Sequence, residues 1–99
     1  MPYITEENRD EFAKGMQELE NDTLEMEKPG ELNYVLSNII LDYVLRKGLC
    51  YDTVNEVMGV ISCIQQEFYR RVVAPYENKK IAENGDLPQF RKLIDKIGS

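Results

Sequence analysis

The sequence predicts an all-α fold, and three observations lead to this conclusion. Apolar residues recur at intervals of three and four, no segment alternates with a period of two, and glycine or proline stands at the ends of the periodic segments. We expect a central antiparallel helical hairpin of residues 31–47 and 53–73, which is kinked near Pro75 and continues to about residue 84. Short N- and C-terminal helices flank the hairpin, and residues 1–99 form a single helical domain.

A short amphipathic helix is expected near the N-terminus, with Thr5 as its N-cap. Its apolar stripe has positions i, i+4 and i+7, which are Phe12, Met16 and Leu19. Residues 21–30 lack this spacing and end in Lys28-Pro29-Gly30, so we expect a loop between the first two helices.

The second helix, residues 31–47, carries its main apolar face at helical spacing. This face consists of Leu32, Val35, Leu36, Ile39, Ile40, Tyr43 and Val44. Arg46 and Lys47 complement the negative end of the helix dipole. Gly48 followed by Leu49 favours a left-handed C-terminal cap with a hydrophobic contact, which ends the helix.

The third helix is expected to open at Asp52 or Thr53, because Thr53 and Glu56 have the spacing of a capping box. Its apolar residues have the spacing of packed helix pairs and are Val54, Val57, Ile61, Ile64 and Phe68. Pro75 removes one backbone donor, so we expect a kink or interruption before the helix continues to Gly85.

A last short helix is expected to begin at Asp86, with Gln89 three residues later and Pro88 in its first turn. Its apolar face consists of Phe90, Leu93, Ile94 and Ile97.

The composition argues against an enzyme. Histidine is absent, which removes the commonest general base and the commonest metal ligand. The phosphate-loop, dinucleotide-binding and hydrolase motifs are missing as well. Two cysteines are too few for a zinc site, and Cys50 and Cys63 are expected to be buried or half-buried free thiols without an assigned role. We therefore expect no catalytic residue, no metal and no cofactor.

The net charge of −6 argues against binding to duplex nucleic acid, because such binding depends on an excess of lysine and arginine. No apolar run approaches the ~20 residues of a membrane span, so no membrane partner is expected. The N-terminus is acidic and polar, unlike a signal peptide, and the cytoplasm is the expected compartment.

A second apolar stripe lies roughly opposite the main face of the second helix. It consists of Tyr34, Leu41 and Leu45, and Asn38 interrupts it. Either the first or the last helix covers this stripe, or it forms an interface in a homo-oligomer, because a helix that is apolar on two sides must bury both or expose a patch.

Gln65 lies in the middle of the apolar arc of the third helix, and Asn33 is expected at the same level on the second. Two facing amides would satisfy each other inside a bundle, where an unpaired amide costs about 1–3 kcal/mol. They form either a polar layer that fixes the register or the polar floor of a ligand pocket.

The segment from Gln65 to Asp86 is the most distinctive in the chain, because four of the twelve cations of the protein lie within its eleven residues 70–80 and reverse the sign of the charge locally. Its rings and cations alternate, and the candidate ligand-binding residues among them are Tyr69, Arg70, Arg71, Tyr76 and Lys80. Arginine binds phosphate through two parallel donors and tyrosine stacks on bases, so nucleotide binding is chemically reasonable. The alternative is a solvated face, on which Glu67 pairs with Arg71 and Glu77 with Lys80.

Three segments, MPYITEENRD, PGELNYVLSNIILDY and QQEFYRRVVAPYENKKIAENGD, carry a resemblance over nearly the whole chain. In them the sequence resembles a family of small uncharacterised proteins from tailed phages and prophages. The resemblance implies a virus-encoded accessory protein that acts in a bacterial cytoplasm, and it supplies no activity or ligand.

Two functional hypotheses follow. The first is a non-enzymatic phage protein that counters a bacterial defence, for instance by sequestering a phosphorylated nucleotide messenger between subunits. The second is an acidic interaction module that docks onto and inhibits a host protein, or a structural or assembly accessory of the phage. An enzyme that uses carboxylates such as Glu31, Asp42 or Glu67 has no spacing signature in its favour.

Overall fold

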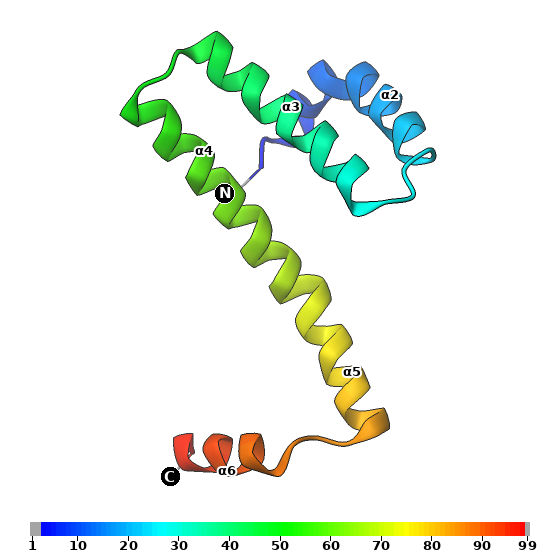
Figure 1. Cartoon of the computed structure of the whole chain (residues 1–99), viewed down its shortest axis with the longest axis vertical. Coiled ribbons are helices and arrows are strands. Elements are labelled where there is room, and N and C mark those ends of the chain that lie inside the picture. The colour runs from blue at the N-terminus through cyan, green and yellow to red at the C-terminus, as the bar shows by residue number, and fades with distance from the viewer. Residues whose placement is uncertain (1–2, 99) are drawn as a thin grey trace. The chain divides into compact units, whose positions relative to one another are not determined.

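The computed structural model describes residues 3–98, which form helices joined by short turns, with no strand among them (Figure 1). The prediction of an all-α protein is therefore confirmed. The chain divides into two compact units, Met1–Val60 and Ile61–Ser99, which we call unit 1 and unit 2 and describe in turn. No helix within the described residues is both long and apolar enough to cross a membrane.

Unit 1 opens with three short helical segments, α1 (Glu6–Arg9), the 3₁₀ turn η1 (Asp10–Phe12) and α2 (Ala13–Thr23). Thr5 is the N-cap of α1, as predicted, and its hydroxyl accepts a hydrogen bond from the backbone N–H of Asn8 at 3.4 Å. Because α2 runs on to Thr23, the predicted loop over 21–30 is too long.

Helix α3 (Pro29–Lys47) begins two residues earlier than predicted. Pro29 is its first residue, where the fixed φ suits a helix and the missing N–H would have no partner in any case. Lys47 is its last residue, as predicted, and Gly48 has a φ of 99° that only glycine adopts readily. Its ψ of 143° is extended rather than left-handed helical, and Leu49 is exposed, so the predicted cap with its hydrophobic contact is wrong.

Helix α4 (Tyr51–Phe68) begins one residue before Asp52, and the predicted capping box is wrong. Thr53, 3% exposed, is the one buried residue among those described, and its hydroxyl lies 3.4 Å from Cys50 Sγ. The partner of Glu56 is the hydroxyl of Tyr43 on α3. The start of α4 is therefore organised around Cys50 and Thr53.

Unit 1 has a half-buried core. Its best covered apolar side chains come mostly from the predicted main faces and are Leu19, Met26, Val35, Ile40, Val44 and Val57. No hydrophobic side chain among residues 3–98 is fully buried. Helices α3 and α4 are linked by a hydrogen bond near their shared turn, and antiparallel packing along the rest of the predicted hairpin stays a prediction.

Unit 2 contains the end of α4, a π turn η2 (Tyr69–Val73), α5 (Ala74–Asn84) and α6 (Pro88–Ile97). The predicted third helix over 53–73 is continuous, and its last five residues form the π turn. The helical ribbon continues from α4 into α5 without a break (Figure 1). The irregularity expected near Pro75 is thus the π turn, which lies just before the proline in the sequence. Helix α5 ends at Asn84, close to the predicted limit.

Helix α6 begins at Pro88, with Leu87 as its N-cap. The predicted cap by Asp86 is wrong, because the Asp86 carboxylate accepts its hydrogen bond from the N–H of Leu87, its direct neighbour. Proline at the first helical position starts the helix without a side-chain cap.

Candidate ligand-binding strip on the π turn and α5

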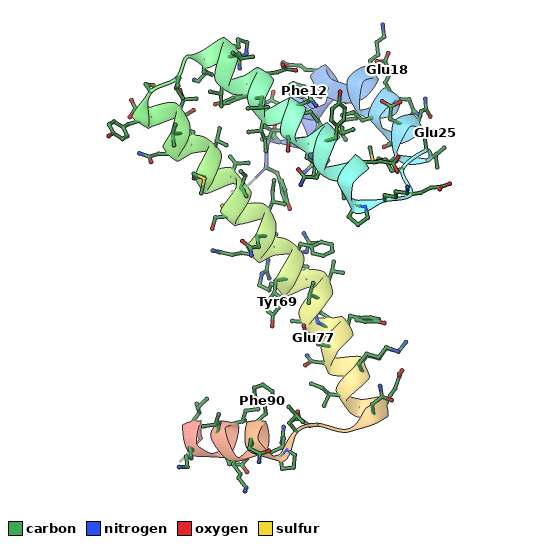
Figure 2. All side chains as sticks on the ribbon, viewed as in Figure 1. Phe12, Glu18, Glu25, Tyr69, Glu77 and Phe90 are labelled. Atoms are coloured by element: carbon green, nitrogen blue, oxygen red, sulfur yellow. The ribbon has the colours of Figure 1, made fainter. Side chains whose placement is uncertain are left out.

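Six cationic and aromatic residues are distributed along η2 and α5. Figure 2 shows their side chains, with Tyr69 labelled. They are Tyr69, Arg70, Arg71, Tyr76, Lys79 and Lys80, all exposed, and we call them the basic strip. Five of them were candidates from the sequence, and Lys79 completes the set.

The π turn is a direct consequence of the proline that follows it. Pro75 has no N–H with which to bond the carbonyl of Arg71, as the fourth residue along would in an α-helix. The N–H of Ala74 bonds instead to the carbonyl of Tyr69, five residues back. A π turn contains one more residue than an α turn. The side chains before it are therefore rotated about the helix axis by about 100° from the positions they would have in an uninterrupted α-helix.

Ion pairs hold two of the four cations. Arg70 Nη2 lies 2.6 Å from Glu67 Oε2, and Lys80 Nζ lies 3.3 Å from Glu83 Oε2. The predicted pairs of Glu67 with Arg71 and of Glu77 with Lys80 are therefore wrong. Each observed partner lies three residues away, and exposed pairs of this kind contribute little to stability.

Lys80 also meets an aromatic ring, because its Nζ lies 5.5 Å from the ring centroid of Tyr76. These two residues are four apart on α5 and share one face of it. The structure thus brings together a ring and a cation that the sequence had only placed near each other in order.

Arg71 and Lys79 form no ion pair with any residue in the described part of the chain. Both are exposed. Their charges are therefore available to a ligand, whereas a ligand that used Arg70 would have to share it with Glu67.

The charge of the protein is divided unequally between the two units. Unit 1 has thirteen acidic and five basic residues, a net charge of −8, and unit 2 has five acidic and seven basic residues, a net charge of +2, which together give the −6 of the chain. The basic strip therefore lies in the one unit that is not acidic.

The two predicted amides belong to different units. Asn33 Oδ1 accepts a hydrogen bond from the hydroxyl of Ser37 at 2.8 Å within α3, and Gln65 is exposed on α4 in unit 2. Their mutual pairing stays a prediction.

The side chains of the second stripe of α3 are exposed to solvent. Tyr34, Leu41 and Leu45 are 70, 58 and 80% exposed, and the interrupting Asn38 uses its side-chain N–H to bond the carbonyl of Tyr34 at 2.8 Å. Helix α2, which belongs to the same unit, therefore does not cover the stripe.

Both cysteines are exposed and free, so the expectation of buried or half-buried thiols is wrong. The hydrogen bond from the Thr53 hydroxyl lowers the pKa of Cys50, and the backbone N–H groups of Thr53 and Asp52 act in the same direction. A residue placed just before a helix is where such a shift is expected, because the first N–H groups of the helix point at it. The feature of the sequence that could have indicated this contact is the position of Cys50, three residues before Thr53.

A family model described as a domain of unknown function (DUF6899) matches residues 1–87. The match includes the second stripe and the basic strip, and α6 follows it. Comparison with curated proteins and with solved structures gives no significant match.

Proposed function

Since this chain belongs to the DUF6899 family, whose function is unknown, we propose that it is a non-enzymatic phage or prophage protein that counters a bacterial defence by sequestering a phosphorylated nucleotide messenger. The observation that supports this most directly is the basic strip, an exposed run of cations and rings in the only unit with a positive net charge.

The chemistry of the strip suits a nucleotide. Arg71 offers two parallel donors to a phosphate, and Lys79 adds a point charge on the following helix. Tyr69 and Tyr76 offer ring faces for base stacking, which is worth about 1–3 kcal/mol per base in proteins that bind single strands. Arg70, held by Glu67, is the less favourable phosphate ligand of the two arginines.

Sequestration requires no chemical step, and the residue inventory fits this. The sequence has no histidine, the commonest general base, and the strip consists of arginine, lysine and tyrosine side chains, which are common ligands of phosphates and bases. The binding energy that a fully exposed strip can supply is limited, so we further expect the working form to be a homo-oligomer in which more than one strip contributes.

The acidic surface of unit 1 favours a second candidate, an interaction module that docks onto a basic surface of a host or phage protein. Its net charge of −8 over about sixty residues would steer such a partner electrostatically. The two candidates differ in the unit that makes the contact.

A thermal-shift screen against linear and cyclic nucleotides tests the proposal, because a ligand that binds only the native state raises the melting temperature. We expect at least one phosphorylated nucleotide to raise it, and Arg71→Lys to remove most of this shift, because lysine keeps the charge and loses the paired donors. Arg9→Lys, an exposed arginine in unit 1, is the matched control and should retain the full shift. If no nucleotide shifts the melt and none co-purifies, the proposal fails and the acidic candidate takes its place.

A further inference from the structure

Helix α6 is strongly amphipathic, and its apolar face is uncovered. Phe90, Leu93, Ile94 and Ile97 occur at i, i+3, i+4 and i+7 and are 47–83% exposed, and Figure 2 shows the ring of Phe90 projecting from the ribbon. An apolar stripe of this width on a ten-residue helix forms a stable helix only when it is packed against something.

The polar side of α6 is basic. It carries Arg91, Lys92 and Lys96 against a single carboxylate, Asp95. Arg91 lies three residues before Ile94 and is therefore its neighbour on the helix surface, at the edge of the apolar face. Whatever covers this face should offer apolar side chains beside a carboxylate.

The second stripe of α3 has this combination. Tyr34, Leu41 and Leu45 are exposed, Glu31 precedes Tyr34 by three residues, and Asp42 precedes Leu45 by three. Each carboxylate therefore lies at the edge of the stripe, on the same face of the helix. The stripe also belongs to the unit of net charge −8, and α6 to the unit of net charge +2.

We propose that α6 of one copy packs its apolar face on the second stripe of α3 of another copy, with the basic edge of α6 against Glu31 and Asp42. The exchange is reciprocal, so a symmetric dimer contains this contact twice. Apolar burial would supply the stability and the opposite charges the orientation. The inference adds the contacting surfaces to the homo-oligomer of the proposed function, and it does not depend on what the basic strip binds.

Two single variants and their mixture test the exchange. Leu45→Glu damages the acceptor stripe on α3, and Ile94→Glu damages the inserted face of α6, because neither site tolerates a buried carboxylate. We expect light scattering to give a dimer or a multiple of it for the wild type, and the 11.5 kDa monomer for each variant alone. An equimolar mixture should recover a heterodimer, because intact α6 from the first variant meets intact α3 from the second.

Leu49→Glu is the matched control, since Leu49 is 83% exposed in the turn after α3 and lies outside the stripe. It should leave the mass unchanged. Raising the salt concentration should weaken the dimer, because the charges at the edges of the contact are screened.

Three results would overturn the exchange. A monomeric wild type contradicts it directly, including one that binds anionic vesicles through α6. Variants that keep the wild-type mass but melt at a lower temperature would place the contact within one chain. Monomeric variants that do not recover on mixing would mean that the two helices do not meet. Nucleotide binding measured on the same variants remains a separate result, because Leu45 and Ile94 lie outside the basic strip.

Discussion

The hydroxyl of Tyr43 on α3 donates a hydrogen bond to Glu56 Oε2 on α4 at 2.8 Å. This contact joins the two helices across the turn at residues 48–50. Arg46 and Lys47 approach the same ring, at 5.5 and 5.9 Å from its centroid. Tyr43 therefore connects Arg46 and Lys47, in the last turn of α3, with the Glu56 carboxylate near the start of α4.

Removing this hydroxyl should loosen the turn. Tyr43→Phe keeps the ring and its contacts with the two cations but loses the hydrogen bond, so we expect the melting temperature to fall by roughly 2–5 °C. Tyr51→Phe is the matched control, because Tyr51 is 88% exposed and has no side-chain hydrogen bond among those described. Equal melting temperatures for Tyr43→Phe and the wild type would show that the bond contributes nothing.

The same bond gives a pH dependence. It raises the pKa of Tyr43, supported by desolvation and by the charge of Glu56, and opposed by Arg46. Because the folded-state pKa is raised, the stabilisation is complete below the ordinary tyrosine pKa of about 10 and is lost as the pH rises through the folded-state value. In an ultraviolet phenolate titration, Tyr43 should ionise at a higher pH in the wild type than in Glu56→Ala.

Cys50 should react faster than Cys63 with an alkylating agent near neutral pH. Its pKa is lowered, first by the hydroxyl of Thr53, so a larger fraction is thiolate, and both thiols are exposed. Thr53→Val should slow Cys50 by about threefold or more, whereas Thr53→Ser, which keeps the hydroxyl, should not. Peptide mass spectrometry at several reaction times measures both rates, and equal rates at the two thiols would contradict the assignment.

Pro75→Ala should stabilise the helix and weaken the proposed ligand site. The new N–H can bond the carbonyl of Arg71 in the α pattern, so we expect the free energy of unfolding to rise by about 1 kcal/mol and the π turn to close. Closing it changes the orientation of the residues in and before the turn, including Arg70 and Arg71, relative to α5. Denaturant unfolding and nucleotide affinity should therefore change in opposite directions, and a rise in both would show that the π turn does not shape the site.

Sequence reasoning worked best where local chemistry decides. The spacing of apolar residues identified every major helix, and Thr5, Lys47 and Gly85 marked ends that the structure retains. Caps that compete with other partners were harder to predict. Glu56 bonds Tyr43 on another helix, and Thr53 meets Cys50, so the capping box that their spacing suggested does not form.

The candidate site was predictable in its composition but not in its geometry. The sequence placed Tyr76 and Lys80 near each other only in order along the chain, and the structure brings them together. A wheel drawn with a constant period cannot include the π turn, so it misplaces Arg70 and Arg71 relative to α5. The ion pairs differ from the predicted ones because Glu67 has two arginines within reach and Lys80 has two carboxylates, Glu77 and Glu83, and spacing alone does not decide between them.

An NMR titration tests the central claim most directly, because it reports which residues a ligand touches. ATP and cyclic di-AMP, as a linear and a cyclic probe, would be added to the isotope-labelled protein and the backbone amide shifts followed. The account predicts saturable shifts for at least one probe, concentrated in residues 69–80 and reduced in Arg71→Lys. Shifts concentrated in unit 1, or no shift with either probe or with any other nucleotide active in the thermal screen, would contradict it.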